Sequence, residues 1–165
     1  MALITNRTYE DCERAKYLLD KVHAGGVLTT QEKDEYFSGL RGCYNMATDW
    51  VRVEGKVAEL SGKLNLNLET KTNWTYKSIA TREEINRYLG NISALCAAVV
   101  LPEGTPNIPT IEDWIDYRVA NDIERLLEMV EDSIQASRGV IQIGDTLLIK
   151  HSVNVRKQAN ILMIT

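Results

Sequence analysis

Residues that hold metal ions or form disulfide frameworks are scarce in this sequence. Its 165 residues include three cysteines and two histidines. Cys12, Cys43 and Cys96 lie about thirty to fifty positions apart, without a Cys-x-x-Cys pair or a histidine at ligand spacing. That spacing argues against a zinc motif or a disulfide scaffold. We therefore expect reduced, largely buried thiols and no metal or other cofactor.

Clustered positive charge and long apolar runs are also lacking. The chain has 19 Lys and Arg against 23 Asp and Glu, and its longest basic group is the pair Arg156 and Lys157. Phosphate binding depends on clustered basic side chains, so we expect no nucleic-acid partner. No segment approaches the roughly 20 apolar residues of a membrane span, and the amino terminus has no apolar signal core. We expect no membrane association and a cytoplasmic location, unless a larger assembly carries the chain.

Familiar catalytic motifs are absent as well. The sequence has no phosphate-binding loop, dinucleotide fingerprint or Gly-x-Ser-x-Gly turn. His23 and His151 have no carboxylate or thiol beside them, and we interpret them as a helix-end charge and a strand surface residue. We expect a protein that is not an enzyme. The alternative is a scattered catalytic site that uses Cys43 or His151.

Apolar residues at helical spacing dominate what is present. Five stretches repeat them every three or four positions, and a threonine suited to capping precedes each stretch. The predicted helices begin after Thr8, Thr29, Thr48, Thr81 and Thr110. Glu32 and Glu84 complete capping boxes with Thr29 and Thr81. The stripes predict a core that includes Ala15, Leu19, Trp50, Val53, Val57, Leu60, Tyr88, Leu89, Ile92, Leu95, Trp114, Ile123, Leu127 and Val130.

The periodicity changes after Gly139. Ile141 and Ile143 alternate with polar residues, Gly144-Asp145 suits a two-residue hairpin turn, and the chain ends in the uncharged run ILMIT. The predicted fold is therefore mainly α: a bundle of four or five helices over residues 1–138, then a β-hairpin and strand tail over residues 139–165. A polar connector, residues 65–78, interrupts the helical pattern.

Interface candidates come from the connector and the tail. Trp and Tyr are enriched at protein interfaces, and Trp74 and Tyr76 lie outside every helical stripe. An exposed ILMIT strand would promote aggregation, so it must pair with the chain's own hairpin or with a neighbouring chain. The candidate interface residues are Trp74, Tyr76, Ile161, Leu162, Met163 and Ile164.

An acidic face runs along the last predicted helix. Its members are Glu124, Glu128, Glu131 and Asp132. Like charges four residues apart occur on ordinary solvated helix faces, but they also suit a cation or a basic partner. Both interpretations stay open at this point.

Three segments resemble proteins from the tail-morphogenesis regions of phages and prophages of Gram-positive bacteria. YNMATDWVRVEGKVAEL, Tyr44 to Leu60, is similar to a stretch with Tyr-Asn, an Asp and Arg-Val/Ile-Glu, although Val51 stands where that stretch has Asn. TNWT with TREEINRYLGNISAL, Thr72 to Thr75 and Thr81 to Leu95, is similar to an Asn-Arg-Tyr-Leu-x-Asn helix. IPTIEDWIDYRVANDIERLL, Ile108 to Leu127, resembles a proline-led loop and an Ala-Asn-x-Ile-Glu helix.

The resemblance implies a virion structural protein of the tail tip or baseplate, present in several copies and without enzymatic activity. Its partners would be other virion proteins or copies of itself, in particles assembled in the host cytoplasm. Polar residues of the first two segments are expected to fix helix starts and the register between helices. These residues are Asn45, Asp49, Arg52, Asn86, Arg87 and Asn91. The alternative is a small intracellular binding module, such as a regulator or an assembly chaperone.

Overall fold

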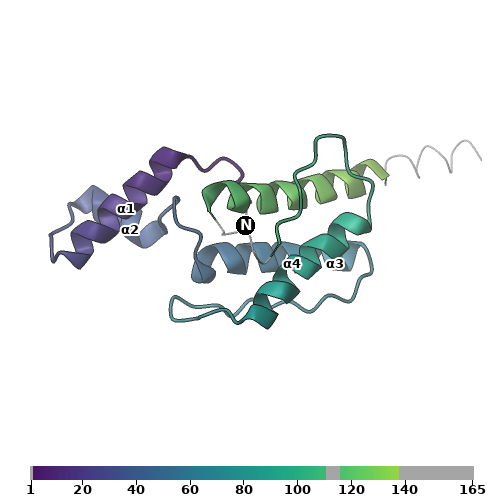
Figure 1. Cartoon of the computed structure of the whole chain (residues 1–165), viewed down its shortest axis with the longest axis horizontal. Helices are drawn as coiled ribbons and strands as arrows, with labels where there is room; N and C mark the ends of the chain where they lie inside the picture. Colours follow the sequence, from purple (N-terminus) through teal and green to yellow (C-terminus); the bar gives the residue numbers. More distant parts are fainter. Residues whose placement is uncertain (1, 111–115, 138–165) are drawn as a thin grey trace, which may run out of the picture.

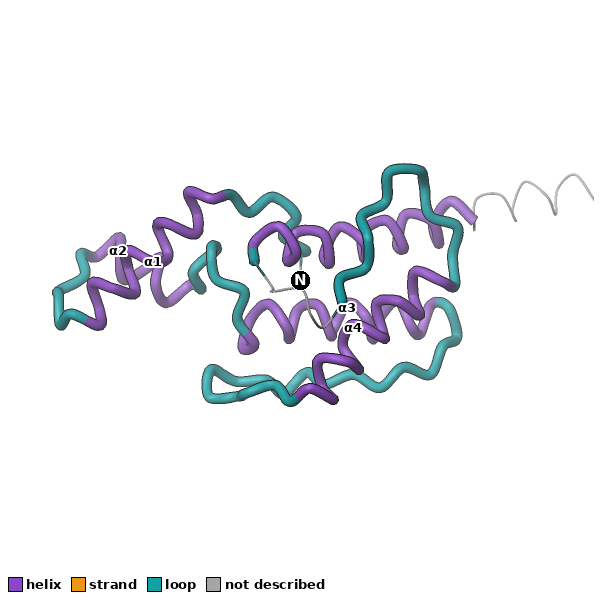
Figure 2. Tube along the Cα trace, viewed as in Figure 1, coloured by secondary structure: helices purple, strands orange, loops and turns teal. Residues whose placement is uncertain are grey.

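A computed structural model describes residues 2–110 and 116–137. These residues form α1 (Tyr9–His23), α2 (Thr30–Ser38), a π-helical turn η1 (Met46–Trp50), α3 (Val51–Lys63), α4 (Arg82–Ala97) and a last helix over residues 117–137. The described part contains no strand (Figure 2). The expectation of a mainly helical fold is confirmed, while the predicted hairpin and the candidates Ile161, Leu162, Met163 and Ile164 lie outside the described residues.

The helices form two groups with separate cores. α3, α4 and the last helix pack into the body of the molecule, whereas α1 and α2 pack on each other and project from one end (Figure 1). We call residues 9–38 the arm. Its small core is built on Ala15 and Leu18, with Leu40 from the segment that follows α2. Leu18 is fully buried although the predicted core omitted it, and Leu19, which the predicted core included, is only partly buried.

Threonine caps start three of the helices as predicted. The side chains of Thr8, Thr29 and Thr81 each accept a hydrogen bond from the backbone N–H three residues later. The acidic side chain at that later position accepts a hydrogen bond from the backbone N–H of the threonine. The capping box thereby satisfies two backbone donors that a helix start leaves free. At the other end of α1, Gly25 adopts a φ of +74°, a conformation that favours glycine and ends the helix.

The two remaining helices begin at residues other than the predicted threonines. Asn45, not Thr48, caps η1: its Oδ1 accepts hydrogen bonds from the Thr48 N–H at 3.0 Å and from Oγ1 at 2.8 Å. The last helix begins at residue 117, where Asp116 Oδ1 accepts the N–H groups of Arg118 and Val119. Both changes have one cause, because Asn and Asp cap as well as Thr does and lie nearer the positions where the backbone turns helical. Trp114 lies outside the described residues.

The core of the body follows the predicted stripes closely. Its buried members from η1, α3, α4 and the last helix include Trp50, Val53, Val57, Leu60, Tyr88, Leu89, Ile92, Leu95, Ile123, Leu126, Leu127 and Val130. Trp50 stacks on Tyr88 with ring centroids 4.5 Å apart, and the edge of Trp74 meets Trp50 at 5.1 Å. None of the described helices is long and apolar enough to cross a bilayer.

Leu60→Ala should destabilise the body by about 2–5 kcal/mol, because it leaves a cavity at a fully buried position of α3. Urea unfolding followed by circular dichroism measures the change. Val100→Ala, at a residue that is 89% exposed, is the matched control and should stay within about 0.5 kcal/mol of the parent. Equal effects of the two substitutions would contradict the assignment of the core.

Candidate functional site

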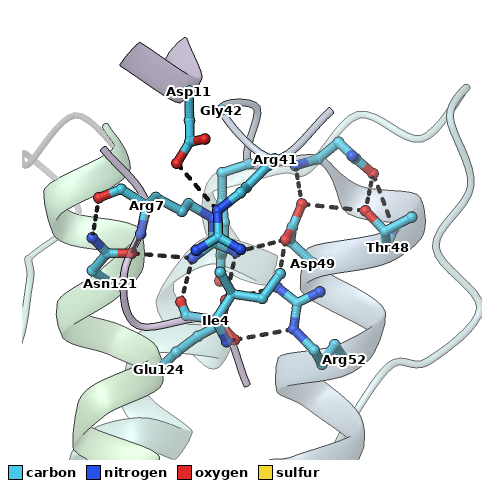
Figure 3. A network of polar contacts seen from close by, with 12 residues as sticks. Ile4, Arg7, Asp11, Arg41, Gly42, Thr48, Asp49, Arg52, Asn121 and Glu124 are labelled. Atoms are coloured by element: carbon cyan, nitrogen blue, oxygen red, sulfur yellow. Dashed lines mark hydrogen bonds and ion pairs between the residues drawn. The ribbon is translucent and has the colours of Figure 1, made fainter. Parts of the chain in front are cut away.

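The most unusual feature of the structure is a buried group of four charged side chains, Arg7, Asp49, Arg52 and Glu124, which we call the four-charge network (Figure 3). None of the four is more than 7% exposed. Arg7 Nη2 lies 2.7 Å from Asp49 Oδ1 and 2.7 Å from Glu124 Oε1. Arg52 Nη2 contacts the same two oxygens, and its Nε lies 3.0 Å from Glu124 Oε2.

Each member reaches the network from a different part of the chain. Arg7 comes from the segment that precedes α1, Asp49 from η1, Arg52 from α3 and Glu124 from the last helix. The two residues that are close in sequence, Asp49 and Arg52, are three positions apart and lie on the same helix face. The network therefore joins both ends of the described chain to its middle.

Backbone and amide groups add further hydrogen bonds around the four charges, while Arg7 Nε is buried without a hydrogen-bond partner among the described residues. The Ile4 N–H donates to Glu124 Oε2 at 2.6 Å, and Arg7 Nη1 donates to the Ile4 carbonyl oxygen at 2.6 Å. Asn121 accepts from the Arg7 N–H at 3.0 Å and donates back to the Arg7 carbonyl at 2.9 Å. The Arg7 guanidinium also lies 5.4 Å from the centre of the Tyr44 ring. The amino-terminal segment is thus fastened along the last helix.

The network balances two positive charges against two negative ones. Burial alone would lower the pKa of Arg52, but the hydrogen bonds that its guanidinium donates to Glu124 and Asp49 outweigh burial and raise that pKa. Removing a charged group from water costs several kcal/mol, which only well-formed partners offset. Loss of any one member would therefore leave a buried charge without full compensation. We infer that its chemical role is to hold segments in register, because its polar atoms are directed at one another.

A second polar cluster ties the connector to the body. Glu54, on α3, is fully buried and accepts from Arg87 Nη1 at 3.0 Å and from the Lys71 N–H at 3.1 Å. Arg87 and Asn91, both on α4, donate to the Glu69 carbonyl at 2.9 and 2.7 Å. The connector is therefore held across α3 and α4 by Glu54, Arg87 and Asn91. All three side chains come from the segments that resemble phage tail-region proteins.

Trp74 and Tyr76 occupy opposite environments in the folded connector. Trp74 is only 4% exposed because the connector lays it against Trp50, with Lys71 Nζ 3.8 Å from its ring centre. In this conformation Trp74 belongs to the chain's own core and is not available to a partner, contrary to the prediction. Tyr76 is 75% exposed and remains accessible.

The predicted acidic face is not a single surface. Glu124 is buried in the four-charge network, and Glu131 pairs with Lys56 at 2.6 Å and Lys63 at 2.7 Å. Glu128 and Asp132 are exposed. Desolvation and the neighbouring Asp132 raise the pKa of Glu128. Of the four carboxylates of the predicted acidic face, only Glu128 and Asp132 are exposed to solvent. A solvated face or a site for a cation or basic partner would have needed all four.

Two of the four charges, Asp49 and Arg52, were predicted from the sequence to take part in polar networks. Asp49 and Arg52 were expected in polar networks that fix helix register, and they are there, as are Arg87 and Asn91 in the second cluster. Asn86 is exposed. Glu124 was assigned to an acidic face, although it follows Ala120 by four positions on the buried stripe. Its position on the apolar stripe was the one local sign that Glu124 is buried. Arg7 lies in an extended segment and had none.

The three thiols are free. Cys96 is buried, and Cys12 and Cys43 are partly buried. Desolvation raises the pKa of all three thiols, which keeps them protonated near neutral pH and weakens them as nucleophiles. Over residues 2–110 and 116–137, no three His, Cys, Asp or Glu side chains gather as metal ligands would.

No protein-family model, curated protein or solved structure matches this chain significantly.

Glu124→Gln should destabilise the protein by about 3–5 kcal/mol, because it leaves two buried guanidinium groups with one carboxylate. Glu128→Gln, one turn further along the same helix at an exposed position, is the matched control and should change the free energy of unfolding by less than about 0.5 kcal/mol. Urea unfolding at neutral pH gives both values. A cost below about 1 kcal/mol for Glu124→Gln would show that the network contributes little.

Tyr88→Phe should reduce the loss of stability at alkaline pH. Desolvation raises the pKa of Tyr44 and Tyr88, whose hydroxyls share a hydrogen bond. A group with a raised folded pKa stabilises the fold fully below its unfolded pKa, about 10 for tyrosine, and loses that contribution as the pH rises further. Urea midpoints between about pH 8 and 11 test this. Tyr17→Phe, at an exposed position, should keep the parent's alkaline decline, and a parent-like decline in Tyr88→Phe would refute the claim.

Proposed function

We propose that this chain is a non-enzymatic structural subunit of a phage tail or baseplate, assembled through protein–protein contacts. One observation carries the proposal: the residues that support the resemblance form the internal ties of the fold. Tyr44, Asp49, Arg52 and Glu54 are engaged with other parts of the same chain, and Asn45 caps η1. A segment that shapes the fold in this way suits a protein whose task is to present a fixed surface.

The distribution of charge is consistent with assembly. Residues 138–165 contain four basic side chains and one acidic one, which leaves 15 basic and 22 acidic side chains in residues 1–137, a net charge of −7. A basic tail on an acidic body supports contacts between copies, because opposite potentials attract and guide association. Accessible apolar side chains add to this support, with Phe37 78% and Tyr76 75% exposed.

Deletion of residues 139–165 should leave the helices folded and abolish incorporation into particles. The core and the four-charge network lie within residues 2–137, so the helical circular dichroism signal of the residues that remain should persist. Particles purified from cells producing the full chain or the truncated chain can be compared by mass spectrometry. The full chain should be found in particles at a fixed ratio to other tail proteins.

Two results would count against this function. Truncated protein in particles at the parental ratio would remove the role of the tail. Absence of the full chain from purified particles, with abundant protein in the producing cells, would reject a virion subunit and favour an assembly chaperone or regulator.

A further inference from the structure

An apolar groove lies between the arm and the body. It has a volume of about 520 Å³ and is lined mainly by carbon-rich side chains from α1, α2, the segment that follows α2 and the connector. The lining residues used below are Leu19, Tyr36, Phe37, Leu40, Cys43 and Tyr76. We call this hollow the arm groove.

Two aromatic side chains remain accessible beside the arm groove. Phe37 and Tyr76 are about three-quarters exposed, while Leu40 is buried and Tyr36 meets Phe37 edge to face at 5.5 Å. Exposed aromatic residues beside a buried leucine offer an anchor site for an apolar segment of another chain. Tyr76 was expected at an interface, and the groove supplies a surface for it.

We propose that the arm groove receives the carboxy-terminal ILMIT run, residues 161–165, of a neighbouring copy of this chain. The run has no charged residue and needs cover from water, which an apolar groove provides. Arg156 and Lys157 precede it, and residues 138–165 carry a net charge of +3. The arm, residues 9–38, contains seven acidic and four basic side chains, a net charge of −3. The apolar character of the groove and the negative charge of the arm therefore both favour the carboxy-terminal segment as the partner.

The positions of the groove and of the last helix favour a neighbour over the chain's own tail. The last helix ends at the opposite end of the long axis from α1 and α2 (Figure 1). The described chain therefore stops at the end of the molecule away from its own groove. A groove at one end and a tail at the other define a head-to-tail contact, which repeats into a ring or a filament.

Insertion of side chains suits this surface better than strand addition. Residues 2–110 and 116–137 provide no strand and hence no sheet edge to extend. The contact would thus resemble an apolar peptide seated in a groove between helices, with anchors from Ile161 to Ile164.

This inference deepens the proposed function by naming the contact through which copies associate. It is tested on the purified full-length chain by sedimentation velocity over a range of concentrations. The parent should associate, and salt should weaken the association because charge contributes to it. Since the measurement needs no phage particle, it can fail or succeed independently of the particle test.

Three full-length variants give the discriminating result. One carries Phe37→Ser and Tyr76→Ser in the groove, one carries Ile161→Asp and Ile164→Asp in the tail, and Val100→Ser is the control at an exposed apolar residue elsewhere. The groove and tail variants should each lose at least about tenfold in association, as truncated anchors do. The control should associate like the parent. Mixed together, the groove variant and the tail variant should form a one-to-one dimer, because each retains the half that the other lacks.

Three outcomes would overturn the inference. A parent chain that stays monomeric at every concentration has no such contact. Unchanged association of the groove variant would place the contact elsewhere. A mixture of the two variants that remains monomeric, while the parent associates, would show that copies do not exchange tails in this way.

Discussion

The pairing of two buried guanidinium groups with two buried carboxylates is the constraint on which the rest of this structure depends. Arg7, Asp49, Arg52 and Glu124 come from four segments, and burial of any one of them without a partner would leave an uncompensated charge. Apolar packing of α3, α4 and the last helix supplies most of the driving force for folding, but packing alone is tolerant of small shifts. The network removes that tolerance at one end of the body.

The network also explains how the arm is attached to the body. Arg7 lies two residues before α1, so the segment that enters the arm is fixed to the last helix. The segment that leaves the arm passes Gly42, where a Cβ atom would overlap the backbone of Asp11, so this close approach requires glycine. Arg41 contacts Asp11 from the same segment at 3.1 Å. The arm therefore projects from a fixed base, although its own core is small.

How far the sequence predicted this structure depends on the range of the interaction concerned. Capping boxes at Thr29 and Thr81 and the stripes of α3 and α4 are local patterns, and they were predicted correctly. The start of the helical segment that begins with η1 was misplaced by three residues, because Asn45 and Thr48 are both good caps. Glu124 and Arg7 meet across 117 positions, and no local pattern encodes such a pair. Trp74 was misjudged for the same reason: its burial depends on Glu54 and Arg87, which draw the connector across two helices.

Hydrogen exchange of the backbone amides of Ile4 and Arg7 in the intact protein tests the central claim most directly. Amides this close to a chain terminus ordinarily exchange within fraying motions. The Ile4 N–H donates to Glu124 and the Arg7 N–H to Asn121. If the four-charge network fastens the amino-terminal segment to the last helix, both amides should exchange as slowly as the core amides of α3, through unfolding of the whole body. Exchange at the rate of an unstructured segment, with α3 still protected, would contradict the account.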